Sequence, residues 1–451
     1  NDFQGLTPSG EARKVSVPSG FAKASIIYGR FGKNFMRLNI RYFIIELLYI
    51  SLAVGIFAAD WPQFRGPNAD GIAPGTGYNF DWKKSPPKVR WKVALTDEGF
   101  AGPAVAGGTV FIIDHKSGKD IVRALDEKSG NECWRYAYPE TGSELYGFAR
   151  STPTINDGRV YTVSRSGLVY CLDAKSGKKI WCRDMVKEFA GRRPQWYYSM
   201  SPLVDGDAII ICPGGINSSV AALNRLTGKT IWRGGGSDEP GYATPVAAVI
   251  NGVKQYVIFT ATALIGVDAA AGKLLWRFPW TTPLEPAVDT EAARDHFNAN
   301  AAVPIVIGNS IFITTGYGHG SALIEINGNK ATAKWQSKAM QSQYSSPVYK
   351  DGYIYCTSDP RSLVCLDIKT GAAVWRKDGI NRGGGLAAVD GMLMVMDGVR
   401  GEMILVSMTP KSYQEIGRFT PLGGESRTAP VIADGYLFVR NRKSLACINL
   451  R

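Results

Sequence analysis

The feature that most constrains the fold is a sequence pattern that recurs from residue 100 to the end of the chain. Each copy begins with a small residue and Pro, passes through an apolar pair, a Gly turn and a β-rich hairpin, and ends with Leu-Asp, another Gly turn and a Trp. The second copy is the clearest and runs from Pro153 through Asp173 and Gly177 to Trp181. A repeat of this length predicts one supersecondary unit stacked many times, rather than two or three unrelated domains.

Eight copies can be aligned, and each predicts four strands. They begin at or near Pro103, Pro153, Pro202, Pro245, Pro304, Pro347, Leu386 and Pro430. Successive Trp residues are 47, 51, 44, 59 and 40 residues apart, which suits one four-stranded blade per repeat. The Asp or Asn after Leu can accept hydrogen bonds from its own turn, and Gly takes the positive φ that closes the turn. Alternating apolar residues indicate strands with one face toward each neighbouring blade.

The two ends of the repeat region complement each other. The eighth copy stops at Asn449, before its outer strand, and residues 89–93 (Val-Arg-Trp-Lys-Val) have the pattern of that missing strand. Pairing the first strand with the last would close the ring and remove its open edges. We therefore predict an all-β, eight-bladed β-propeller of four-stranded antiparallel blades, closed by an N-terminal strand. Seven blades is the alternative, if the seventh copy, which lacks the Trp, and the eighth form one distorted blade.

Pro, Leu-Asp, Thr/Ser-Gly and Trp at these offsets resemble the repeats of the pyrroloquinoline-quinone (PQQ) propellers, over residues 89–451. The resemblance implies that the Trp residues lie between blades. Residues 60–67 (Asp-Trp-Pro-Gln-Phe-Arg-Gly-Pro) resemble the opening of secreted members of this superfamily. Two branches have known roles: the quinoprotein dehydrogenases, which oxidise alcohols or sugars with PQQ and calcium, and BamB, a periplasmic scaffold in outer-membrane β-barrel assembly.

The part of the chain before the repeats divides into three segments. Residues 1–35 show no periodicity and are expected to be an upstream, disordered extension. From Met36 a short basic region leads into the apolar residues 42–58 and then Ala58-Ala59, the layout of a signal peptide at 36–59 that is cleaved near Ala58 or Ala59. An uncleaved anchor is the alternative, because the apolar run approaches the minimum spanning length. Residues 60–88 are expected to pack on the propeller at 89–451, and the protein to be periplasmic or secreted with no membrane span after cleavage.

The net charge and the Cys and His content limit the kinds of ligand and metal site that can be expected. The net charge of +13 favours anionic partners. Nucleic acid is not expected among them, because the sequence has no stripe of Lys/Arg alternating with aromatic residues. The seven Cys lack haem or zinc spacing and are expected to be buried thiols or an occasional disulfide. The three histidines, His115, His296 and His319, fall in predicted turns or loops, where we expect them to be exposed. No metal site is predicted from them.

The loops that join each outer strand to the next inner strand should gather on one face of a propeller. Three are long, at 135–150, 182–200 and 277–300, and long loops on a rigid scaffold commonly carry function. Their Arg, aromatic and amide side chains suit a pocket for an anionic or hydroxylated ligand. The predicted binding residues are Arg150, Trp196, Tyr198, Asn300, Gln343, Arg382, Glu425 and Arg427.

Two functions are compatible with these observations. The dehydrogenase branch implies a disulfide between adjacent Cys over the cofactor, a Trp beneath it and a calcium site. No two Cys are adjacent here, although Asp295, Asn298, Asn300 and Glu425 could supply oxygen ligands. We therefore favour a monomeric, non-catalytic binding or scaffold protein of the cell envelope, with an envelope protein or an anionic polysaccharide on the loop face. A PQQ- and calcium-dependent dehydrogenase is the alternative, and no catalytic residue is assigned. The BamB branch has its own mismatch, since no lipid-attachment Cys follows the apolar run.

Overall fold

A computed structural model describes residues 59–96, 99–140, 147–281 and 299–451. Residues 58–451 make up one compact unit. The predicted extension at 1–35 and nearly all of the predicted signal peptide at 36–59 lie outside the described residues. No helix within the described ranges is long and apolar enough to cross a membrane.

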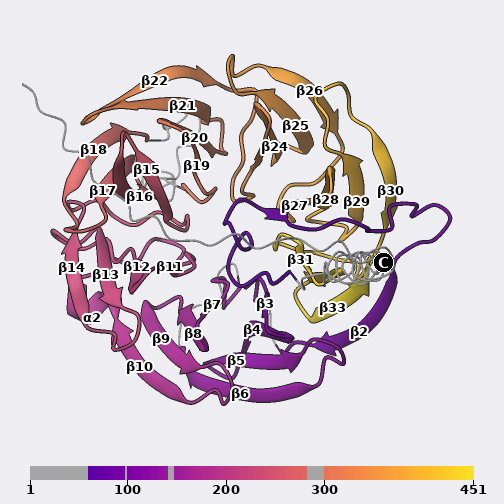
Figure 1. The fold of residues 1–451 in the computed structure, drawn as a ribbon, viewed down its shortest axis with the longest axis horizontal. Coiled ribbons are helices and arrows are strands. Elements are labelled where there is room, and N and C mark those ends of the chain that lie inside the picture. Colours follow the sequence, from indigo (N-terminus) through magenta and orange to yellow (C-terminus); the bar gives the residue numbers. More distant parts are fainter. Residues whose placement is uncertain (1–58, 97–98, 141–146, 282–298) are drawn as a thin grey trace, which may run out of the picture. The chain divides into compact units, whose positions relative to one another are not determined.

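The unit consists of eight antiparallel sheets arranged as the blades of a propeller (Figure 1). In each blade the first strand is innermost, and the chain moves outward strand by strand. The first four blades comprise β3 (Ala104–Ala106), β4 (Thr109–Lys116), β5 (Lys119–Asp126) and β6 (Glu132–Pro139); β7 (Thr154–Asn156), β8 (Arg159–Val163), β9 (Leu168–Asp173) and β10 (Lys179–Asp184); β11 (Leu203–Asp205), β12 (Ala208–Ile211), β13 (Val220–Asn224) and β14 (Thr230–Gly234); and β15 (Val246–Ile250), β16 (Val253–Phe259), β17 (Ala263–Asp268) and β18 (Leu274–Pro279).

The remaining four blades follow the same plan. They comprise β19 (Ile305–Ile307), β20 (Ser310–Thr315), β21 (Gly320–Asn327) and β22 (Lys330–Ser337); β23 (Val348–Lys350), β24 (Tyr353–Ser358), β25 (Ser362–Asp367) and β26 (Ala373–Asp378); β27 (Leu386–Val389), β28 (Met392–Met396), β29 (Met403–Ser407) and β30 (Glu415–Phe419); and β31 (Val431–Ala433), β32 (Tyr436–Arg440) and β33 (Ser444–Asn449) with β2 (Lys88–Ala94). A short helix, α2 (Met185–Phe189), follows β10, and β1 (Ile72–Ala73) adds to β27 in parallel.

The ring closes as predicted. Strand β2 pairs antiparallel with β33, placing Val89 opposite Ile448 and Trp91 opposite Cys447. The seventh and eighth copies form separate sheets, so the eight-bladed prediction is confirmed and the seven-bladed alternative is wrong. Because the outermost strand of the last blade comes from the other end of the repeat region, the two ends of that region are hydrogen-bonded within one sheet.

The recurring Trp and Gly explain how one blade meets the next. Trp134 of blade 1 donates its indole N–H to the Ala174 carbonyl of blade 2 at 2.9 Å. Its ring lies on Gly177, where an added Cβ would come within 2.5 Å of the indole. Gly177 also has φ +70°, which Gly adopts without strain. The same contact joins the pairs Trp91 and Gly130, Trp181 and Gly228, Trp232 and Gly272, and Trp335 and Gly371.

The seventh blade obtains its indole from another segment. Gly417 of β30 stands opposite Leu405, the position that Trp occupies in the other blades. Trp82, which precedes the first strand of the ring, is buried over Gly417, where an added Cβ would lie 3.0 Å from the Trp82 Cβ. The Trp82 ring also meets Phe419 edge-on, with centroids 5.0 Å apart. The N-terminal segment thus fills the space that the missing Trp leaves.

Residues 60–73 cross the centre of the ring. The Trp61 N–H and C=O both bond to Val105 of blade 1, and the Pro62 carbonyl accepts the Ile155 N–H of blade 2. Arg65 donates to the Pro347 carbonyl of blade 6 at 2.8 Å, after which β1 pairs with β27 of blade 7. The segment therefore ties together inner strands from opposite sides of the propeller, as the indigo trace in the middle of Figure 1 shows.

Candidate binding cavity

A cavity of about 610 Å³ lies at the centre of the propeller, on the face where the inner strands begin. Its wall is built from one repeat position, the small residue before the inner strand. The residues at this position that line the cavity are Gly102, Thr152, Ser201, Thr244, Ser346, Gly385 and Ala429. The small residue of the repeat therefore leaves the centre open, and seven of the eight blades contribute to the wall.

The hydroxyl groups of this wall also connect the blades. Ser201 Oγ accepts the Thr152 N–H at 3.0 Å, and Thr244 Oγ1 accepts the Ser201 N–H at 3.0 Å. Ser346 Oγ accepts the Val303 N–H at 3.1 Å in the same way. Each hydroxyl thus satisfies a backbone donor of the preceding blade, which explains why Ser and Thr recur at this position. These bonds join the wall residues of neighbouring blades to one another.

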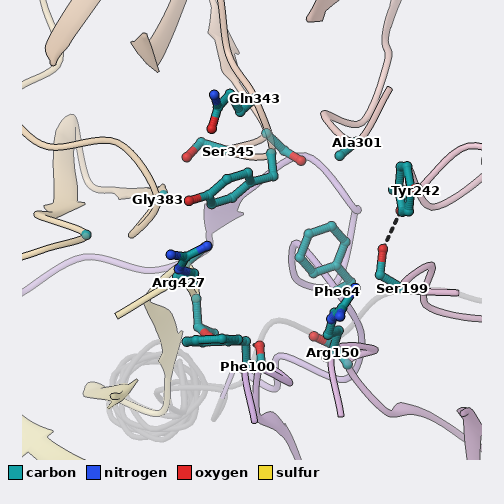
Figure 2. A pocket seen from close by; sticks show the side chains of 18 of the residues that line it. Phe64, Phe100, Arg150, Ser199, Tyr242, Ala301, Gln343, Ser345, Gly383 and Arg427 are labelled. Carbon is teal, nitrogen blue, oxygen red and sulfur yellow. Dashed lines mark hydrogen bonds between the residues drawn. The ribbon is translucent and has the colours of Figure 1, made fainter. Parts of the chain in front are cut away.

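The cavity floor consists of Trp61, Phe64, Arg65 and Gly71 of the N-terminal segment. The Arg65 guanidinium is buried and donates to the carbonyls of Ala69, Asp70 and Pro347. Burial lowers the pKa of Arg65 to about 10, so the side chain remains cationic at neutral pH. Figure 2 shows the Phe64 ring directed into the cavity, near Arg150. The floor thus presents an aromatic ring with positive charge beneath it.

Arg150 is the cation on one side of the cavity. Its guanidinium donates to the Trp196 carbonyl and to the Gly147 carbonyl. The Trp196 and Tyr242 rings lie 5.7 Å apart beside it, and the Tyr242 hydroxyl accepts the Trp196 N–H. Burial, followed by repulsion from Arg165, lowers the pKa of Arg150 to about 10. A ligand that brings a negative charge here would offset this desolvated positive charge.

Arg427 is the cation on the opposite side, where Figure 2 shows it beside Phe100. Its guanidinium carbon lies 5.4 Å from the centroid of the Phe100 ring and 6.0 Å from that of Tyr344. Glu425 Oε1 accepts from Arg427 Nε at 2.7 Å, and Glu425 Oε2 lies 3.4 Å from Arg442. The aromatic rings and the carboxylate together fix the direction of the Arg427 guanidinium.

Among the described residues, arginines outnumber carboxylates in the cavity lining. The described lining includes Arg65, Arg150, Arg382 and Arg427 and one carboxylate, that of Glu425. Arg382 is paired with Asp359 at 2.7 Å, and Gln343 lies nearby in the wall. Cations with several N–H donors, set among aromatic rings, match an anionic ligand that also has a flat or apolar part.

Six of the eight residues predicted from the sequence line the cavity. They are Arg150, Trp196, Gln343, Arg382, Glu425 and Arg427. Tyr198 and Asn300 are not among the lining residues. The buried Tyr198 hydroxyl donates toward the carbonyls of Arg192 and Pro213, and Asn300 bonds to Thr260, Ala261 and Thr315. Both side chains hold loop backbone in place, a role that residue type and loop position alone do not distinguish from ligand binding.

The floor and several aromatic lining residues were not predicted from the sequence. Phe64 and Arg65 belong to the segment 60–67, whose sequence resembles the opening of secreted superfamily members but does not indicate a binding role. Phe100, Tyr317 and Tyr344 also line the cavity. Tyr344 directly follows the predicted Gln343, so of these residues it was the one that the sequence could most easily have placed in the cavity. The wall residues had a clear signal in the small residue before Pro, because inner strands of a propeller converge on the centre.

The described residues do not provide the calcium site that the dehydrogenase branch implies. The carboxylate oxygens of Glu425 face Arg427 and Arg442, and the Asn300 amide is fully engaged. Asp295 and Asn298 fall outside the described residues. No group of three or more His, Cys, Asp or Glu in the described ranges could hold a metal ion. No Cys lines the cavity, so a disulfide over a quinone has no counterpart there either.

The expectations for His115, His319 and Cys133 need correction. His115 is buried rather than exposed, because its Nδ1 lies 2.8 Å from the buried Asp120 carboxylate and its ring stacks on Phe148. His319 packs against Trp280, and burial lowers its pKa to about 4, while His296 lies outside the described residues. All seven Cys are free thiols, and Cys133 is exposed because it sits on the outermost strand of blade 1.

The comparisons point to one superfamily. A family model described as outer membrane protein assembly factor BamB matches residues 74–148 and 118–377. Outer membrane protein assembly factor BamB of Yersinia pestis is 22% identical over 294 residues, covering 65% of this chain and 72% of that protein. Quinohemoprotein alcohol dehydrogenase ADH IIB of Pseudomonas putida is 32% identical over 152 residues, covering 31% of this chain and only 21% of that protein. The solved structure of BamB from Moraxella catarrhalis superposes with a TM-score of 0.58 at 15% identity, covering 81% of this chain and 98% of that chain, a likeness of fold alone.

Proposed function

Because the chain belongs to the PQQ-repeat family described as outer membrane protein assembly factor BamB, we propose that it is an exported, non-catalytic binding protein of the cell envelope. Its ligand is an acidic segment of an envelope protein, in which a carboxylate neighbours an aromatic or apolar side chain. The observation that carries this proposal is the cavity whose described lining sets four arginines and one glutamate among aromatic rings.

The surroundings of the cavity favour a protein ligand over a free sugar acid. Val399 and Tyr317 line the cavity and remain 61% and 38% exposed, so apolar surface continues from the cavity to the outside. Such surface suits residues that flank an acidic anchor in a peptide. The relatives include an assembly factor of Yersinia pestis, which by its name acts on other envelope proteins. The net charge of residues 59–451, which is +9 once the +4 of residues 1–58 is subtracted from +13, would speed the approach of an acidic partner.

The proposal is tested by calorimetry with short peptides that contain Asp or Glu beside Phe, Tyr or Trp. We expect the acidic peptides to bind and their Asn or Gln counterparts to bind at least tenfold more weakly. Arg427→Gln should weaken the acidic peptides by about 10–100-fold, because a hydrogen bond to a charged group contributes about 1.5–3 kcal/mol. Arg233→Gln is the matched control, since Arg233 is exposed on an outer strand and does not line the cavity.

Other results would replace this proposal. If oligouronates bind with the same dependence on Arg427 and acidic peptides do not bind, the ligand is an anionic polysaccharide. If PQQ with Ca²⁺ raises the Tm and produces quinone absorbance, the dehydrogenase alternative holds. Equal binding by wild type and Arg427→Gln would show that the cavity is not the binding site.

A further inference from the structure

Two carboxyl groups face each other where the last blade meets the first. Glu127 lies in the outer turn of blade 1 and is 5% exposed, and Asp434 lies in the inner turn of blade 8. Glu127 Oε1 and Asp434 Oδ1 are both buried and have no hydrogen-bond donor among the described residues. As two carboxylates they only repel, so they can bond to each other only by sharing a proton.

The surrounding charges do not resolve this repulsion. Burial, followed by the Asp434 charge, raises the pKa of Glu127 to about 7, and Asp60 adds a third negative charge. The positive charge of Arg90 lowers the pKa of Glu127, and that of Arg451 lowers the pKa of Asp434, but in each case burial and the neighbouring carboxylates outweigh this effect. Arg90 donates to Tyr436 and to the Lys128 carbonyl, and no ion pair within 4 Å joins it to either carboxylate. The site therefore has excess negative charge and buried acceptors that a cation with N–H donors would satisfy.

The first described residues of the chain run directly past this site. The Ala59 carbonyl accepts the Asp434 N–H at 3.3 Å, and Asp60 Oδ1 accepts the Gly107 N–H at 3.1 Å. Gly108, the next residue of that turn, accepts the Glu127 N–H through its carbonyl. Ala59 is thus bonded to the turn that carries Asp434, and the adjacent Asp60 is bonded to the inner turn of blade 1, whose Gly108 is bonded to Glu127. Its own nitrogen is only three covalent bonds from the carbonyl that Asp434 holds.

We propose that hydrolysis of the Ala58–Ala59 peptide bond during export places the new α-ammonium group of Ala59 against Glu127 and Asp434. In this step water and an export peptidase break the C–N bond, the Ala58 carbonyl carbon gains the hydroxyl, and the Ala59 nitrogen gains the proton. A second proton from solvent makes the nitrogen an ammonium group with three N–H donors. The resulting ion pair locks the processed N-terminus to both sides of the ring closure. The inference rests on the proposed export but not on the identity of the ligand.

The first measurement is the mass and the N-terminal sequence of the full chain after expression and export in a bacterium. We expect Ala59 as the first residue, and an unprocessed chain or a distant cleavage site would overturn the proposal. This readout is independent of peptide binding, so a ligand that does not bind leaves it intact.

The second measurement separates an ion pair from simple cleavage. A Gly-Ser-Gly insertion between Ala58 and Ala59 of the full chain moves the ammonium group away from the acid pair after processing. At pH 7.5, Glu127→Gln should lower the Tm by about 2–4 °C in the natural chain and raise it in the insertion variant. The change in Tm reverses its sign because Glu127 is paired with the ammonium group in the natural chain but is a buried, unpaired charge in the insertion variant. The same sign in both backgrounds would contradict the proposal.

The pH dependence gives a further check. A carboxyl group whose pKa is raised on folding loses stability as pH rises from its unfolded value toward about 7, so the insertion variant should become less stable across that range. The natural chain should resist this loss until the α-ammonium deprotonates at about pH 8 or above. Asp434→Asn should remove the difference, whereas Asp351→Asn, at the equivalent exposed turn of blade 6, should leave it unchanged. Restoration by Ca²⁺ of the insertion variant alone would indicate a metal cation as the natural partner instead, and would overturn the proposal.

Discussion

At the scale of single residues, the repeat is a set of paired requirements. In five pairs a Trp of one blade lies on a Gly of the next, at the place where a Cβ would be, and in four turns an Asp or Asn is followed three residues later by Ser or Thr. Asp126 Oδ1 accepts both the N–H and the hydroxyl of Ser129, at 2.8 and 2.7 Å, and these bonds lower the pKa of Asp126. Such local bonds fix the turn geometry before any blade contacts another.

The indole contact can be separated from backbone strain by comparing two glycines. Gly177 and Gly158 both have φ +70°, but a Cβ on Gly177 would lie 2.5 Å from Trp134, whereas one on Gly158 would meet nothing within 4 Å. Gly158→Ala should cost about 1–2 kcal/mol, the strain of a positive φ alone. Gly177→Ala should cost clearly more, because Trp134 must also move. Urea unfolding measures both, and equal losses would show that the indole contact is unimportant.

How far the sequence predicted the structure differs between residues in strands and residues in loops. Blade count and closure followed from a period and from one five-residue pattern, because most copies repeat the same turn and strand sequence. Tyr198 and Asn300 were misplaced because a polar loop side chain can point to a ligand or to loop backbone with the same composition. Phe64 was missed because its position depends on a segment that crosses from blade 2 to blade 6, and no local pattern encodes that path.

At the scale of elements, the N-terminal segment repairs an irregular blade. In β30 the position of Trp is Gly417, and Trp82 fills the space from outside the repeat, while its indole N–H donates to the Asn79 carbonyl at 3.0 Å. In turn, the Asn79 N–H donates to the Leu450 carbonyl at the end of blade 8 at 2.7 Å. The segment therefore spans the junction of the last two blades, where the repeat itself provides no Trp.

Trp82→Ala should destabilise the propeller by about 3–5 kcal/mol, as for other buried Trp residues. The double variant Trp82→Ala/Gly417→Trp places an indole within the blade. It should recover part of this stability if the two side chains fill the same space between the blades. Chemical denaturation compares the three proteins. A double variant that is no more stable than Trp82→Ala would mean that Trp82 acts through its contacts with the segment and not by filling the blade.

At the scale of the whole molecule, the buried thiols report whether the ring stays closed. Five cysteines lie in the hydrophobic cores that neighbouring blades share. Burial raises the pKa of these residues, Cys171, Cys212, Cys356, Cys365 and Cys447, to about 12. A thiol with so high a pKa forms almost no thiolate at pH 8 and does not react until its blade opens. The blades share their cores with their neighbours, so opening of one should expose several thiols.

We expect one thiol, that of Cys133, to react rapidly with a disulfide reagent in the native protein at pH 8, and all seven to react after unfolding in urea. Cys182 is partly buried, and burial raises its pKa, so it should react more slowly than Cys133. Cys133→Ser is the control and should abolish the rapid phase. Several rapid thiols in native protein would indicate that blades separate readily, and fewer than seven after unfolding would indicate a disulfide.

The segment that crosses the ring also decides what kind of molecule can enter it. Since Trp61, Phe64 and Arg65 lie across the bottom of the cavity, a long polymer cannot be threaded through the propeller from one side to the other. Only a chain end, a side branch or a tight bend can be inserted, and it must leave by the way it came. The cavity can therefore recognise the end, a side branch or a tight bend of a ligand chain, but not the middle of an extended polymer.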